Sequence, residues 1–201
     1  MKLSVALVLS SLACSVCAVT CQVRADTWNL PAPLNDSNTS VSFVVDSTWQ
    51  TVHGTTKDLA GSIALKDKND PLSIMVDLQI QVQAFDTDWD SKDEKLKECM
   101  GYETYPMVSF SSKRLSENCK PSVLDRVGRC SGKLTGTLTM RDVSKEVELP
   151  VEIIKEQHVY RINGELPLLW AEYNIEDPSI LIARLDPTVT ISYETKVPLK
   201  R

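Results

Sequence analysis

The chain has little of what most enzymes need. Its 201 residues include two histidines, His53 and His158, and neither lies in a motif that supplies a nucleophile or an orienting acid. The Gly-x-Ser-x-Gly turn of serine hydrolases is absent, as are glycine-rich phosphate loops. Beyond residue 25 there are no closely spaced Cys or His pairs of the kind that bind structural zinc. We therefore expect no catalytic residues, no cofactor and no metal, which favours a binding protein.

Basic residues are also too few for a nucleic-acid-binding protein. Lys and Arg number 22 against 27 Asp and Glu, which gives a formal charge of −5. This acidity argues against nucleic acid as a partner and against adsorption to anionic membranes. After the first 25 residues, no apolar run approaches the roughly 18 residues that span a bilayer. We expect a soluble protein whose contact with a membrane, if any, is transient.

Residues 1–25 are typical of a secretory signal peptide. Lys2 is followed by the apolar stretch LSVALVLSSLACSVCAV and then by small residues. Cleavage after Ala18 or after Ala25 fits the small-x-small rule, and we favour the second, which predicts export to the periplasm. The mature chain, residues 26–201, has the length of one domain. Its formal charge is −7, because two basic residues and no acid leave with the signal.

The cysteines divide between the signal and the mature chain. A lipoprotein anchor in the signal stays an open alternative, although none of its three cysteines follows a convincing lipobox: Cys14, Cys17 and Cys21. Cys119 and Cys130 flank KPSVLDRVGR, and we predict that they pair and close a loop between two strands. In the chain-entropy model such a loop gives roughly 3 kcal/mol. Cys99 then stays a thiol, either as a small buried side chain on a helix or as a redox or ligand group.

The stretch from Leu72 to Ala84 is apolar at every even position and mostly polar between. A period of two predicts a strand with one buried face and one wet face. The run is longer than the usual strand of about five or six residues, so we expect it to bend or coil.

Similar alternation recurs along the chain and predicts about eight strands, mostly antiparallel. They cover residues 41–45, 61–65, 72–84, 106–110, 133–141, 146–153, 158–170 and 189–197. Within 158–170, Asn163-Gly164 indicates a tight hairpin between HVYRI and ELPLLW. The fold class is all-β, an eight-stranded antiparallel barrel. Such a barrel is either filled by its own side chains or hollow enough for one small ligand, and alternation does not distinguish the two.

One helix is expected among these strands. Ser91 and Glu94 form a capping box, and Gly101 is placed to end the helix after Met100. Leu96, Cys99 and Met100 lie at helical spacing and would form its buried stripe. The helix is expected to cap or flank the barrel.

Several segments together resemble the YceI-like family of secreted, lipocalin-like lipid-binding proteins. The resemblance rests on VSFVV at 41–45, on LQIQVQAFDTDWDSKDEKL at 78–96, on YPMVSF at 105–110 and on GKLTGTLTMRDVSKEVELPV at 132–151. It extends from about Ser40 to Lys196. The C-terminal ELPLLWAEYNIEDPSILIARL lacks the arginine-aspartate-phenylalanine-glycine pattern that is usual in the family.

The resemblance implies an elongated lipocalin-like barrel whose lumen accommodates a long isoprenoid or other amphiphilic lipid, with no catalysis. The polar head of the ligand would lie near the mouth. Because alternate residues of a strand point to the same face of the sheet, we expect those on the inward face to line the lumen: Phe43, Leu78, Ile80, Val82, Phe110, Leu138 and Tyr193. Trp170 belongs either to the core, which we favour, or to an apolar rim that touches a membrane during transfer.

Three functions are therefore compared. The favoured one is a periplasmic carrier for an isoprenoid-like or other amphiphilic lipid. The first alternative is a filled barrel that serves as a stress or interaction protein. The second is an enzyme acting on a lipophilic substrate, with His53 or His158 as its base. Neither the ligand, the loading partner nor the oligomeric state follows from the sequence.

Overall fold

The computed structural model describes residues 28–177, 179 and 184–199, so the expected signal peptide lies outside the described residues. Two α-helices and eleven strands make up most of this part, together with three short 3₁₀ helices. The elements are β1 (Ala32–Asn35), β2 (Thr39–Ser47), β3 (Thr51–Thr56), β4 (Leu59–Leu65), β5 (Ile74–Gln81), η1 (Val82–Ala84), β6 (Phe85–Asp86), α1 (Asp90–Met100), β7 (Met107–Leu115), η2 (Glu117–Cys119), α2 (Pro121–Val127), β8 (Arg129–Met140), β9 (Val143–Lys155), β10 (Val159–Leu169), η3 (Trp170–Tyr173) and β11 (Leu185–Pro198). Among these residues, no helix is both long and apolar enough to cross a bilayer.

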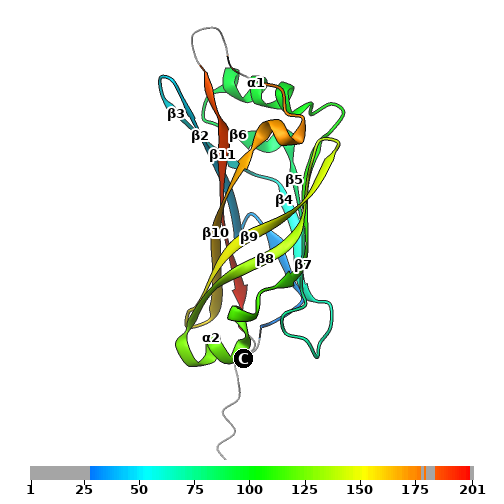
Figure 1. The fold of residues 1–201 in the computed structure, drawn as a ribbon, viewed down its shortest axis with the longest axis vertical. Coiled ribbons are helices and arrows are strands. Elements are labelled where there is room, and N and C mark those ends of the chain that lie inside the picture. The colour runs from blue at the N-terminus through cyan, green and yellow to red at the C-terminus, as the bar shows by residue number, and fades with distance from the viewer. Residues whose placement is uncertain (1–27, 178, 180–183, 200–201) are drawn as a thin grey trace, which may run out of the picture.

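All strands belong to one antiparallel sheet, which curls into a barrel (Figure 1). Its strand order is β1-β4-β5-β7-β8-β9-β10-β11-β2-β3-β6. The all-β, antiparallel expectation is confirmed, but the predicted count of eight strands is wrong, because the described chain has eleven. The difference arises where the chain bends: β3 and β4 are separated only by Lys57 and Asp58, and β5 and β6 only by η1. Short β1 and polar β3 also lack the apolar alternation that reveals a strand.

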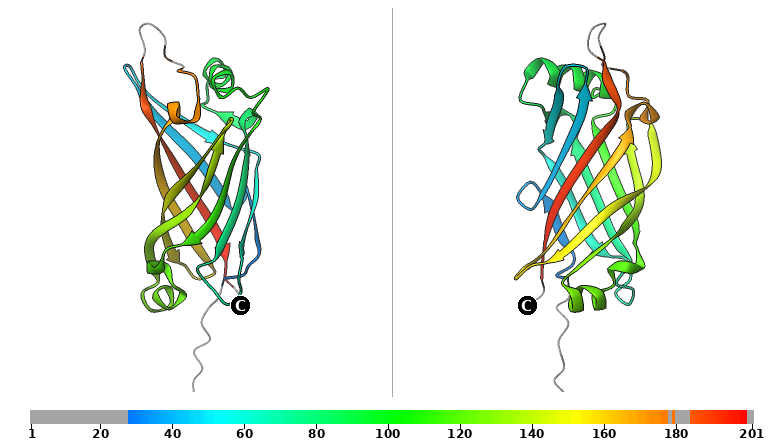
Figure 2. Two further views of the ribbon diagram at one scale, coloured as in Figure 1. Left: turned by 45° about the vertical axis from the view of Figure 1, so that its right-hand side comes forward. Right: turned by 60° about the vertical axis from the view of Figure 1, so that its left-hand side comes forward.

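The long alternating run is bent in the structure. Its strand, β5, ends at Gln81, and the chain turns through η1 before β6 begins. β4 pairs with β5 from Leu59 opposite Ile80 onward, whereas β3 pairs with β6. The bent segment formed by β3 and β4 therefore stays beside the bent segment formed by β5 and β6 as the sheet curls (Figure 2).

The hairpin predicted at Asn163-Gly164 is wrong. β10 runs through both residues without a turn, and Gly164 lies directly opposite Tyr193 on β11. A Cβ at position 164 would lie 1.9 Å from the Pro150 carbonyl oxygen and 2.4 Å from the Tyr193 hydroxyl. Glycine is present here because two neighbouring groups occupy the space of a side chain, and not because the chain reverses.

The helix α1 lies over one end of the barrel, and α2 lies at the opposite end (Figures 1 and 2). The predicted capping box is wrong, since the N-cap residue is Trp89 and no side chain caps the helix start. Instead, the Asp93 carboxylate accepts hydrogen bonds of 2.7 and 2.6 Å from the backbone N–H and the hydroxyl of Thr87. The predicted end at Gly101 is confirmed, because this residue adopts the left-handed conformation with φ of 65°.

One helix is expected from the sequence, and α2 is a second. It begins at Pro121 and ends before Gly128, which has a φ of 77°. The disulfide predicted between Cys119 and Cys130 is confirmed, with Cα atoms 5.3 Å apart, and it joins η2 to β8 beside this helix. Leu124 of α2 is completely buried. The helix α2 covers the lower end of the barrel in Figure 1.

Candidate functional site

The interior of the barrel contains a cavity of about 280 Å³, so the barrel is hollow. Its lining comes from strands all around the sheet and from α1, and it is almost entirely hydrocarbon. The question that alternation left open is thus answered in favour of a hollow lumen. A cavity with this lining shields apolar groups from water and offers very few partners to a charged one.

The pairing register explains how three of the predicted residues come together. Leu78 on β5 lies opposite Phe110 on β7, and Phe110 lies opposite Leu138 on β8. All three line the cavity. They form a continuous inward row across three neighbouring strands, because directly opposed residues point to the same face of a sheet.

The other predicted residues are distributed as follows. Ile80 lies opposite Leu59 and lines the cavity below the bend of β5. Phe43 and Tyr193 line the opposite wall on β2 and β11. Val82 does not belong to the described lining, because it lies in η1, where the alternation stops, and it is fully buried in the core. Six of the seven expected residues therefore border the cavity, and Val82 supports the wall beside it.

Three aromatic rings on the cavity wall cover glycines. A Cβ on Gly54 would lie 2.1 Å from the ring of Phe43, and a Cβ on Gly136 would lie 2.5 Å from the ring of Phe110. The ring of Tyr193 covers Gly164 in the same way. Aromatic rings that lie against glycine on a neighbouring strand are a known way to cover its bare backbone. All three aromatic residues also border the cavity.

Several polar groups in the lining are paired within the protein. The Tyr193 hydroxyl donates a hydrogen bond to the Pro150 carbonyl, and burial raises the pKa of this hydroxyl. Thr39 and Thr195 share a hydrogen bond of 2.8 Å between their hydroxyls. The Glu194 carboxylate lies 3.8 Å from Arg161 and from Lys196. None of these groups therefore gives the lumen an unbalanced charge.

The helix α1 also contributes side chains to the lining, and strand alternation could not have predicted these. Leu96, Cys99 and Met100 line the cavity from above. The thiol of Cys99 is free and buried, and burial raises its pKa, so it stays neutral. This placement agrees with the expectation of a small buried side chain on a helix. The helical spacing of the three residues predicted that they would be buried together. The structure adds that the surface they cover is the cavity.

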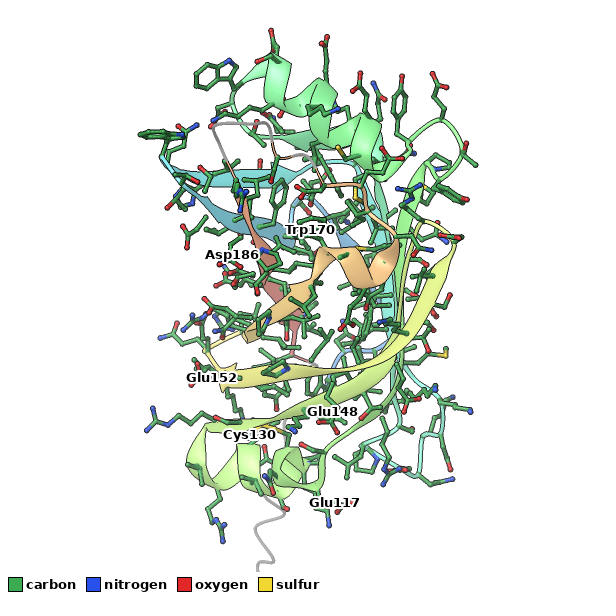
Figure 3. All side chains as sticks on the ribbon, turned by 45° about the horizontal axis from the view of Figure 1, so that its top comes forward. Glu117, Cys130, Glu148, Glu152, Trp170 and Asp186 are labelled. Atoms are coloured by element: carbon green, nitrogen blue, oxygen red, sulfur yellow. A yellow bond between two sulfur atoms is a disulfide. The ribbon has the colours of Figure 1, made fainter. Side chains whose placement is uncertain are left out.

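Trp170 borders the cavity at the end of β10. It is half-buried, and its indole Nε1 donates a hydrogen bond of 2.9 Å to the carbonyl oxygen of Asp186 on β11 (Figure 3). Its neighbour Leu169 is 42% exposed. Trp170 is thus held against the barrel and Leu169 lies at the surface, and contact of this segment with a membrane stays a prediction.

The two histidines lie outside this site. His53 on β3 and His158 after β9 are both exposed, and neither belongs to the cavity lining. Among the described residues, no group of three or more His, Cys, Asp or Glu is arranged to hold a metal ion. The site can enclose an apolar molecule, and neither histidine is placed beside the cavity.

Comparison with known proteins agrees with this geometry. The chain is similar in structure to Burkholderia cenocepacia BcnA, with a TM-score of 0.66 and 17% identity over 79% of this chain and 95% of that one. A polyisoprenoid binding domain from Saccharophagus degradans, implicated in plant cell wall breakdown, matches with a TM-score of 0.65 and 13% identity over 85% and 99%. The Campylobacter jejuni YceI protein matches with a TM-score of 0.59 and 21% identity over 76% and 87%.

The sequence gives the assignment independently of these structures. No curated protein matches it. The model of the YceI-like domain, however, matches residues 33–197, which covers the sheet from β1 almost to the end of β11. The chain therefore belongs to the YceI-like family.

Proposed function

We propose that this protein is a non-enzymatic binding and carrier protein that holds the hydrocarbon chain of an isoprenoid-like or other amphiphilic lipid in the barrel cavity. The observation that carries the proposal is the almost wholly apolar lining of the lumen. Each buried CH₂ of such a chain gains about 0.8 kcal/mol relative to water. The Saccharophagus degradans domain of similar fold is described as polyisoprenoid binding, which supports the same ligand class here.

The proposed location is the periplasm, which rests on the signal-like residues 1–25. An oxidising compartment is consistent with the Cys119–Cys130 disulfide. Contact with a membrane would be transient and would serve loading or release.

The first experiment is organic extraction and mass spectrometry of protein purified from its native envelope without detergent. We expect a stoichiometric isoprenoid or acyl species. A folded protein that carries no lipid and takes up neither geranylgeraniol nor palmitic acid would contradict the proposal and favour a stress or interaction protein without a small ligand.

A matched pair of variants tests whether the lumen holds the ligand. Leu78 points into the cavity and its neighbour Gln79 is exposed on the outer face of β5. Leu78→Asp places a charge in the apolar lumen and is expected to weaken lipid binding at least tenfold, whereas Gln79→Asp leaves binding unchanged. Circular dichroism confirms that both variants are folded. Equal lipid content in the two variants would contradict binding in the lumen.

A further inference from the structure

The wall of the barrel is not equally closed on all sides. β8 and β9 pair over twelve residue positions, and β10 and β11 over eleven. Between them, β9 and β10 pair at only four positions, from Lys155 opposite Tyr160 to Glu152 opposite Asn163. Above this point the two described strands share no ladder, and they diverge in Figure 1. We call this unpaired region, between residues 143–151 and 164–169, the β9–β10 window.

A surface hollow of about 380 Å³ lies in the window. Its lining comes from β9, β10, η3 and β11. Leu166 and Leu168 of β10 border this outer hollow and also border the inner cavity. At this position the two spaces are therefore separated by leucine side chains and not by a hydrogen-bonded sheet.

The contacts that border the window differ in strength between its lower side and its upper side. The lower side is the β9–β10 ladder itself, reinforced by the hydrogen bond from the Tyr193 hydroxyl to the Pro150 carbonyl. The upper side is an ion pair of 2.6 Å between Lys145 of β9 and Glu172 of η3, whose side chains are 37% and 50% exposed. Exposed pairs of this kind contribute little to stability. The Lys145–Glu172 ion pair therefore does little by itself to hold the upper side closed.

The chemistry of the two facing strands argues against a partner strand as the occupant. Pro150 on β9 and Pro167 on β10 lack the N–H that an added strand would need. Proline is also one of the residues by which exposed strand edges resist pairing with other chains. The apolar partition of Leu166 and Leu168 instead suits an apolar chain.

We propose that the β9–β10 window is the portal through which the hydrocarbon chain of the ligand enters and leaves the cavity, with Leu166 and Leu168 as the side chains that move aside. This inference rests on the proposed function. It adds a route through the wall and names the residues that control the rate of exchange.

The portal is tested by closing it with a cross-link. Glu146 and Leu169 are both exposed and both border the outer hollow, so Glu146→Cys with Leu169→Cys can be bridged by a short bismaleimide. The matched control is Ser131→Cys with Glu152→Cys, across strands that are already paired. Cys99 is buried and burial raises its pKa, so it does not compete for the reagent.

The readout is stopped-flow uptake of N-phenyl-1-naphthylamine and its displacement by geranylgeraniol. We expect the bridged window to slow both rates at least tenfold with an unchanged final amplitude, and the bridged control to stay within twofold of the unmodified protein. Exchange through the bridged window at the rate of the control overturns the portal. If neither probe enters the unmodified protein, the proposed function fails together with the portal, whereas unchanged rates with normal binding overturn the portal alone.

A second pair of variants decides the matter if the bridged protein does not stay folded. Leu168→Trp enlarges the partition and is expected to slow exchange about fivefold, and Leu168→Ala is expected to speed it by a similar factor. The equilibrium amplitude is measured beside the rate for both variants, so a change in affinity is distinguished from a change in the rate of exchange. Rates that move in the same direction, or not at all, overturn the portal.

Discussion

The two ends of the barrel are closed in different ways. At the lower end, a disulfide, the buried Leu124 of α2 and a stack between Trp28 and Tyr160 with ring centroids 4.7 Å apart form one packed cluster. At the upper end, α1 rests on the cavity through Leu96, Cys99 and Met100 and is tied down by polar contacts near the surface. The lower end is thus closed by packing and a covalent bond, whereas α1 closes the upper end without a covalent link.

The largest expected effect is at the lower end. Leu124 is completely buried, and Leu124→Ala removes this packing and leaves a cavity, so the free energy of unfolding should fall by about 3 to 4 kcal/mol. Val127, the last residue of the same helix, is 55% exposed, and Val127→Ala should change it by less than about 0.5 kcal/mol. Urea titration measures both. Similar losses in the two variants would mean that α2 does not seal this end.

Removal of the disulfide comes next. Cys119 and Cys130 are separated by 11 positions, and replacement of both by alanine frees this loop in the unfolded chain. The chain-entropy model predicts a loss of about 3 kcal/mol. Probe uptake by the folded variant should not change, because neither cysteine lines the cavity. Loss of uptake without loss of stability would show that the lower end, too, belongs to the binding site.

A smaller effect is expected at the upper end. Arg141 donates a hydrogen bond of 2.9 Å from Nη1 to the carbonyl oxygen of Cys99 near the end of α1. Arg141→Ala should cost about 1 kcal/mol and should speed amide exchange in α1 more than in the barrel strands. Glu94→Ala, at an exposed position of the same helix, is the control. Uniform acceleration across all strands would show that this end is as tightly coupled to the barrel as the other.

The smallest expected effect is a pH dependence beside the window. Burial raises the pKa of Tyr193 above its ordinary value of 10.0, so the folded protein keeps the hydroxyl neutral after the unfolded chain has begun to ionise. This contribution is fully present below about pH 10 and is lost as pH rises further. Tyr193→Phe should therefore flatten the decline of stability above about pH 10, as followed by thermal unfolding. Parallel declines in the two proteins would contradict a buried hydroxyl.

The sequence predicted the residues around the cavity better than the connections between the strands. Alternation placed Leu78, Phe110 and Leu138 on inward faces, and register then brought them into one row. The alternation of β5 gave no sign that η1 would take Val82 away from the lining. A bend of this kind depends on contacts far along the chain, such as the hydrogen bond of 2.9 Å from the Val82 N–H to the Pro106 carbonyl.

Two other predictions were wrong or missed because the same local sequence pattern can accompany different structures. Asn-Gly commonly marks a hairpin, but Gly164 is required by Tyr193 on the adjacent strand. The helix α2 did carry a signal, with proline at its first turn and glycine after its last residue, in a segment that was interpreted only as a connection. The β9–β10 window has no local signal, because it is defined by the absence of pairing between two strands that each alternate normally.

The rings that lie over Gly54, Gly136 and Gly164 have a consequence for how this family can diverge. The bore of the barrel is set by its smallest residues, since each glycine allows a large ring to lie flat against the wall. Replacing one of these glycines by alanine would push a ring inward and narrow the bore at that height. Ligand length and thickness can therefore change among such barrels through glycines that never touch the ligand.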